Sequence, residues 1–329
     1  MPKSMLYTGQ HDDVPTKVEH FHYNKNELKV TDGFEPLEGY LSYIQVTGLS
    51  DVSSIKEIQK HYKVDDIVLE DIFNVKQRNK LEPKEHYLFG VFRCEYIIGT
   101  DIKEDYFSLL LFEDTIITFH EKVPIILSPI RNLFENYQEL RKRPIDFLFY
   151  QVLDIMTDQH LAVYDYLEKA SEQFEESILE NRQLNQETFY MIRKHLLKLK
   201  SNVSPILDNL TILLSKSHPL IKKENKDFFD DLIDHFIRLD NHLNQSREMM
   251  RHLLDLHINN QSNKMNRIMT TLTLFSAIFI PLSFLTGFFG MNFVHFEVLE
   301  YEHSLIIFIG LCFLLAGFML LLFKKMKWF

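Results

Sequence analysis

Ten positions between Asp255 and Gly287 fall on one line when this segment is drawn as a helix, because they are spaced alternately by four and three residues. In the apolar part of the segment the line reads Thr, Ser, Ile, Ser, Gly, whereas the other faces carry Leu, Ile and Phe. Small and hydroxyl side chains on an apolar helix serve either close helix packing in lipid or the lining of an aqueous path. We favour the path, because the line continues into oxygen-bearing side chains beyond the apolar part. The positions, called the stripe below, are Asp255, Asn259, Ser262, Asn266, Met269, Thr273, Ser276, Ile280, Ser283 and Gly287.

A single amide, Asn292, stands in the stretch GFFGMNF, which separates two apolar runs near the end of the chain. Asn292 is the only residue of the seven with a polar side chain. An amide there has two plausible roles: it caps the end of a helix, or it presents an oxygen acceptor to a ligand.

The two apolar runs are Ile268–Phe289 and Ser304–Phe323, and neither contains a charge. Each is about 30 Å long as a helix, which matches the hydrocarbon thickness of a bilayer, so we predict two membrane spans rather than two buried core helices. Basic residues flank the pair on its outer ends, whereas the linker 290–303 has no Lys or Arg. The positive-inside rule then places both chain ends in the cytoplasm and the linker outside. The flanking basic residues are Lys264, Arg267, Lys324, Lys325 and Lys327.

The composition limits the class of protein. With 46 acidic and 36 basic residues the formal net charge is −10, which argues against a nucleic-acid partner and suits a surface that meets cations. Two cysteines, Cys94 and Cys312, make no disulfide framework and favour a reducing compartment. The first thirty residues contain no apolar signal segment, so we expect the N-terminal part in the cytoplasm.

The remaining pattern predicts an α+β membrane protein. Residues 1–143 form a cytoplasmic α/β domain, with strands at 40–49, 86–97, 106–112 and 115–121 and a helix at 64–74. Residues 144–225 form a helical hairpin of two helices, 145–182 and 185–217. A stalk helix continuous with the first span then covers 226–289. It is too long to be stable alone, so we expect an oligomer. The other segments are an outer loop 290–303, a second span 304–323 and a basic tail 324–329.

These segments resemble the CorA family of magnesium transport proteins. The resemblance rests on Gly290-Met291-Asn292 after the first of two C-terminal spans, on the ending FKKMKWF, and on the segments LEDIFNVKQRNKLE, DDLIDHF and LLDL. It implies a funnel-shaped homopentamer in the cell membrane that takes up hydrated Mg2+, and also Co2+ or Ni2+, passively. It also implies that Gly290, Met291 and Asn292 form the selectivity filter, with an Asn292 ring at the outer mouth. Mg2+ dehydrates reluctantly, and amide oxygens can accept hydrogen bonds from its water shell. The implied pore-lining residues are Asp255, Asn266, Met269, Leu272, Ile280 and Ser283, of which the apolar ones would gate by excluding water.

The resemblance also implies feedback by the transported ion. Regulatory Mg2+ would bind between neighbouring subunits at Asp231 and Glu85, where the family often has Asp in place of Glu85. The weaker candidates are Glu82, Asp230 and Asp234. Two carboxylates facing across an interface repel without a cation and attract through one. The outer loop departs from the family pattern, since FVHFEVLEYEH has no proline, and its three glutamates receive no assigned role.

Three other functions stay open at this point. A membrane-anchored enzyme is disfavoured, because the sequence has no nucleotide-binding glycine loop, no Gly-x-Ser-x-Gly and no His-Glu-x-x-His. His20, His22 and His120 have no metal-ligand spacing, and we assign them to the surface or the core. The other two functions are zinc transport within the same superfamily and a non-conducting divalent-cation sensor. Met291 in the motif favours magnesium over zinc.

Overall fold

The computed structural model describes residues 7–180, 185–291 and 301–326, and these residues divide into two compact units, Met1–Arg251 and His252–Phe329. The first unit has a seven-stranded sheet with the order β2-β1-β3-β7-β6-β5-β4. All neighbouring strands are antiparallel except β3 and β7, which are parallel. The strands are β1 (Lys17–Tyr23), β2 (Leu28–Asp32), β3 (Leu41–Thr47), β4 (Lys80–Pro83), β5 (Leu88–Ile98), β6 (Asp101–Leu111) and β7 (Thr115–His120).

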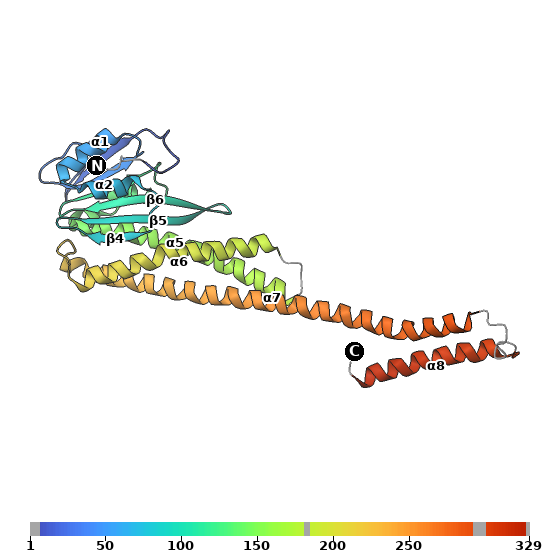
Figure 1. Ribbon diagram of the computed structural model, residues 1–329. Coiled ribbons are helices and arrows are strands. Elements are labelled where there is room, and N and C mark those ends of the chain that lie inside the picture. Colours follow the sequence, from blue (N-terminus) through green and yellow to red (C-terminus); the bar gives the residue numbers. More distant parts are fainter. Residues whose placement is uncertain (1–6, 181–184, 292–300, 327–329) are drawn as a thin grey trace. The chain divides into compact units, whose positions relative to one another are not determined.

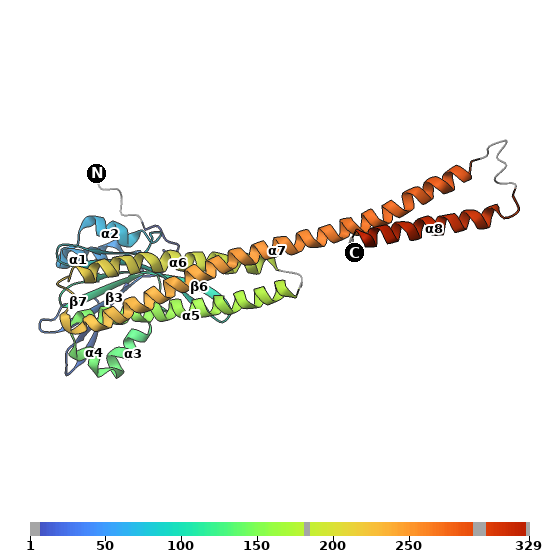
Figure 2. The ribbon, with the colours of Figure 1, turned by 90° about the horizontal axis from the view of Figure 1, so that it is seen from below.

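Helices cover both faces of this sheet (Figure 1). On one face lie α1 (Val52–Tyr62) and α2 (Asp66–Phe73), which share a core of buried Ile, Val, Leu and aromatic residues with the strands. On the other lie α5 (Ile145–Leu179) and α6 (Gln186–Ser215), which Figure 2 shows from below. Because both faces are covered, β5 is apolar almost throughout instead of alternating, which is why its run was readable as a strand.

The beginning of α7 (Lys226–Phe289) packs onto α5 within the first unit. Aromatic rings make this contact: Phe147 meets Phe228 at 5.1 Å between ring centroids, and Phe149 meets Phe229 at 5.9 Å. An ionic clamp joins α6 to α7, because both carboxylate oxygens of Asp240 accept from Lys200 Nζ at 2.6 Å. Two short helices, α3 (Pro129–Asn136) and α4 (Gln138–Lys142), complete this unit, and Phe134 of α3 packs against Phe21 of β1.

The second unit contains the rest of α7 and α8 (Ser304–Lys325). Among the described residues, these are the helices long and apolar enough to cross a membrane, and their most apolar windows have no residue buried within the chain. A soluble protein would cover such surfaces. The uncovered apolar surface therefore agrees with two membrane spans. The ends of α7 and α8 lie within two residues of the ends predicted for the stalk helix and the second span.

Several elements escaped the sequence analysis. The N-terminal strands β1 and β2, the short edge strand β4, and the helices α1, α3 and α4 were not predicted, and β6 begins at Asp101 rather than at 106. His20, His22 and His120 belong to the core: all three are buried, and burial lowers the pKa of His20 and of His120 to about 3. The assignment of these histidines to either the surface or the core is thus resolved in favour of the core.

Candidate ion path and regulatory carboxylates

Three threonine hydroxyls in the apolar part of α7 donate hydrogen bonds to backbone carbonyls of the same helix. Thr271 donates to the carbonyl of Arg267 at 2.9 Å, Thr273 to that of Met269 at 2.8 Å, and Thr286 to that of Ser283 at 3.0 Å. Each bond leaves the hydroxyl oxygen free to accept. This pattern keeps hydroxyl protons paired inside a bilayer, where an unpaired polar group costs several kcal/mol.

The stripe occupies a face of α7 that the rest of the chain leaves open. Each of its ten positions is exposed, and the side chains of Met269, Leu272 and Ile280 are all more than half exposed. The predicted pore-lining residues Asp255, Asn266 and Ser283 are exposed in the same way. One chain therefore presents all six predicted pore-lining residues to its surroundings.

The half-buried positions of α7 form another face. The rings of Phe289 on this face and Phe308 of α8 have centroids 5.2 Å apart, and α8 runs back beside α7 in both views (Figures 1 and 2). The contact with α8 thus leaves the stripe uncovered. In the apolar part of α7 the half-buried positions are Thr270, Leu274, Ala277, Ile278, Pro281, Leu282, Leu285 and Phe289.

The helix ends immediately before the Gly-Met-Asn motif. Gly290 N donates to the carbonyl of Thr286 at 2.9 Å, and Met291 N to that of Phe288 at 3.3 Å. A Cβ built on Gly290 would lie 2.9 Å from the Thr286 carbonyl oxygen. Glycine is thus required here for close approach, and not for positive φ, since Gly290 is not among the described glycines with positive φ. Asn292 lies outside the described residues.

The predicted regulatory carboxylates are distributed over two parts of the first unit. Asp231, on α7, is 68% exposed and has His235 Nε2 3.8 Å away, whereas Glu85, in the turn between β4 and β5, is 87% exposed and has His86 3.7 Å away. Both carboxylates are therefore open to a ligand. Asp230 and Asp234 are exposed on α7 as well.

Glu82 is less available than the other acids. It lies 3.1 Å from Lys80 and 2.9 Å from Lys84. Burial raises the pKa of Glu82, but the bonds to these two lysines outweigh it and lower the pKa below its ordinary value. A cation at Glu82 would have to displace a lysine.

Two acids of α5 near Asp231 were missed in the sequence. Burial, and next the charge of Asp158, raise the pKa of Asp154, and the charge of Asp231 adds to the effect. Asp154 and Asp158 are four residues apart in a helix, so their spacing was readable, but their proximity to Asp231 depends on how α5 packs against α7. Among the described residues, no three His, Cys, Asp or Glu side chains of one chain converge to hold a metal ion.

Comparison with known proteins places the chain among ion transporters. The family model for CorA-like Mg2+ transporter proteins matches residues 38–325. A cobalt/magnesium transport protein CorA of Thermotoga maritima is 28% identical over 99% of this chain and 96% of its own length. A putative metal ion transporter of Bacillus subtilis, YfjQ, is 30% identical over 80% of this chain and 82% of its own. The solved CorA magnesium transporter of Methanocaldococcus jannaschii has the same fold, with a TM-score of 0.80 at 20% identity over 96% of this chain and 99% of that one.

Proposed function

The chain belongs to the family of CorA-like Mg2+ transporter proteins, and from this premise we propose that it conducts hydrated Mg2+ passively through a membrane. The observation that carries the proposal is the uncovered stripe on an apolar helix that ends at Gly290-Met291. An oxygen-lined face that no part of its own chain covers is suited to an aqueous path between copies. The sequence has no nucleotide-binding glycine loop, and in this proposal the driving force is the membrane potential, which supplies about 4.6 kcal/mol per divalent ion at 100 mV.

In this proposal five copies surround one axis and direct their stripes toward it. Asn292 forms the outer ring of the filter with Gly290 and Met291, and Asp255 forms a carboxylate ring at the inner entry. Met269, Leu272 and Ile280 narrow the path with apolar rings, which exclude water when the pore is closed. Asn266 and Ser283 provide weaker polar rings between them, which suits an ion that must also leave. The protein resides in the cell membrane with both ends in the cytoplasm.

We infer that cytoplasmic divalent cations close this path by binding between neighbouring subunits. Asp231 and Glu85 are the proposed ligands, and their exposure within one chain supports a site that a second copy completes. Asp154 and Asp158 join Asp231 in one acidic region of α5 and α7, so a bound Mg2+ would also relieve repulsion within each chain.

Ion flux into proteoliposomes tests the function directly. With an inside-negative potential, the purified protein is expected to admit Mg2+, detected by a trapped indicator, and cobalt hexammine, a mimic of hydrated Mg2+, is expected to block the flux. Co2+ and Ni2+ should compete with Mg2+. Flux of Zn2+ without Mg2+ would support zinc transport instead, and the absence of any flux would support a sensor.

A further inference from the structure

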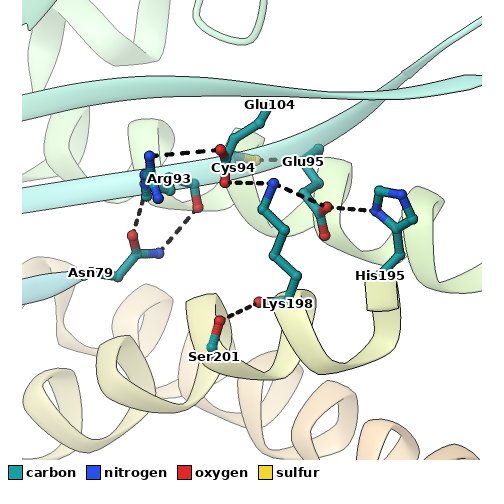
Figure 3. A network of polar contacts seen from close by, with 8 residues as sticks. All are labelled: Asn79, Arg93, Cys94, Glu95, Glu104, His195, Lys198 and Ser201. Carbon is teal, nitrogen blue, oxygen red and sulfur yellow. Dashed lines mark hydrogen bonds and ion pairs between the residues drawn. The ribbon is translucent and has the colours of Figure 1, made fainter. Parts of the chain in front are cut away.

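A cluster of charges around the buried carboxylate of Glu95 joins the sheet to α6 (Figure 3). Glu95 of β5 and Glu104 of β6 lie directly opposite each other in the register of the two strands. Lys198 of α6 lies 3.1 Å from Glu104 and 3.8 Å from Glu95, and Arg93 lies 3.8 Å from Glu104. The two positive charges of Arg93 and Lys198 therefore balance the two negative charges of Glu95 and Glu104. His195 is the fifth member of the cluster.

The cluster lies at the edge of the sheet, where β4 no longer pairs with β5 and α6 lies beside β5 instead. β4 pairs with β5 only as far as Lys80 opposite Val91. Next to this pair, the side chain of Asn79 makes the two hydrogen bonds to the β5 backbone that a neighbouring strand would make. Its Oδ1 accepts from Arg93 N at 2.6 Å, and its Nδ2 donates to the carbonyl of Arg93 at 3.1 Å. The same Nδ2 donates to the carbonyl of Asn202 on α6 at 2.9 Å. The attachment of α6 at this edge is thus polar.

His195 and Glu95 form the closest contact of the cluster between α6 and the sheet. Nδ1 of His195 lies 2.8 Å from Oε1 of Glu95. The Glu95 side chain is only 1% exposed, and its Oε2 has no hydrogen-bond partner among the described residues, whereas His195 is 16% exposed and so can exchange a proton with water. His195 is also the one histidine in the sequence of α6.

We propose that the Glu95–His195 pair is a proton-sensitive latch that holds α6 on the sheet. Imidazoles gain a charge between about pH 8 and pH 5. A proton on His195 changes a neutral hydrogen bond to a buried carboxylate into an ion pair in a region of low dielectric, where the attraction is strong. The latch therefore tightens when His195 takes up a proton. The inference does not depend on ion transport.

The groups around Glu95 determine at which pH the latch weakens again. Burial raises the pKa of Glu95, ahead of the lowering by His195 and Lys198, so the carboxylate takes up a proton above its ordinary range as the pH falls further. The latch then loses its negative partner, and attachment passes through a maximum. The charged groups that act on the pair are Lys198 of α6 and Glu104 of β6, and Arg93 of β5 contacts Glu104. The buried thiol of Cys94 on β5 lies within the influence of both glutamates and of Asp105 on β6. His160 of α5, whose pKa burial lowers to about 4, lies near the backbone of Arg93.

Amide hydrogen exchange of the full chain in nanodiscs tests the latch. After correction for the chemical rate, the protection of the α6 amides around residue 195 is expected to be about three- to tenfold greater at pH 6 than at pH 8, the difference between a neutral and a charge-assisted hydrogen bond. His195→Asn keeps a donor near Nδ1 but cannot gain a charge, so its protection should not change with pH. His61→Asn, at an exposed histidine of α1, should behave like the wild type.

Two results would overturn the proposal. One is wild-type protection of α6 that does not change between pH 6 and pH 8, a result that needs no variant to fold. The other is a pH dependence that persists in His195→Asn, because another group would then be responsible.

Discussion

Replacing Asn292 with alanine is expected to abolish selective Mg2+ uptake while leaving the oligomer intact. In the proposed pore the amide oxygens of this ring accept hydrogen bonds from the water shell of the ion, and a methyl group cannot. Mg2+ exchanges the water molecules of that shell reluctantly. A filter without hydrogen-bond acceptors therefore has no group that distinguishes hydrated Mg2+ from other ions. We expect Mg2+ influx to fall at least tenfold, the loss of about 1.4 kcal/mol of stabilisation or more.

The measurement is flux into proteoliposomes that contain equal amounts of inserted protein, with the oligomer checked by size-exclusion chromatography. Gln261→Ala is the matched control, since Gln261 is an exposed amide of α7 outside the stripe. This variant should conduct like the wild type. If Asn292→Ala retained both the rate and the preference for Mg2+ over Ca2+, the amide would have no part in selection.

Replacing Asp231 with lysine is expected to loosen the feedback by cytoplasmic Mg2+. The residue is largely exposed, and its contact with His235 spans 3.8 Å, so the loss of this contact should change the free energy of unfolding by no more than about 0.5 kcal/mol. A lysine cannot ligate a cation, so the proposed intersubunit site would lose a ligand. The Mg2+ concentration that halves the flux is expected to rise at least tenfold, while the flux without internal Mg2+ stays unchanged.

Glu57→Lys gives the same change of charge at an exposed position of α1 and should keep the wild-type feedback. Flux is measured in both variants at a series of internal Mg2+ concentrations. An unaltered response in Asp231→Lys would remove this carboxylate from the sensor, although the pore could still conduct.

Hydrophobic runs were sufficient to locate the central strands and the long helices. The central strands are buried on two faces and are therefore continuously apolar, and the long helices repeat their apolar positions over many turns. β1 escaped since its core-facing positions include His20 and His22, which read as polar although both are buried. β4 has four residues and ends in Pro83, which an edge position tolerates. The first half of β6 is charged and pairs in a hairpin with β5, so only its apolar half was visible in the sequence. For α1 a signal existed: Asp51 caps the helix by accepting from Ser53 N at 2.9 Å.

The part of the candidate site that lies on one helix could be predicted from the sequence. The spacing along α7 alone places the stripe on one face, and all of its positions are exposed in the structure. The relation of Asp154 to Asp231 depends on tertiary packing between α5 and α7, which the spacing of either helix does not contain. The pairing of Asp231 with Glu85 requires a second copy, so it remains a prediction.

The central claim is that the stripe faces water along a shared axis, and a matched pair of cysteines tests it most directly. In a conducting background without Cys94 and Cys312, Ser276→Cys lies on the stripe and Ala277→Cys lies at the same depth on the half-buried face. A charged, membrane-impermeant thiol reagent is expected to modify Ser276→Cys and block Mg2+ flux, and to leave Ala277→Cys unmodified and conducting. Block at Ala277→Cys with none at Ser276→Cys, or no modification of either, would contradict an aqueous path along this face.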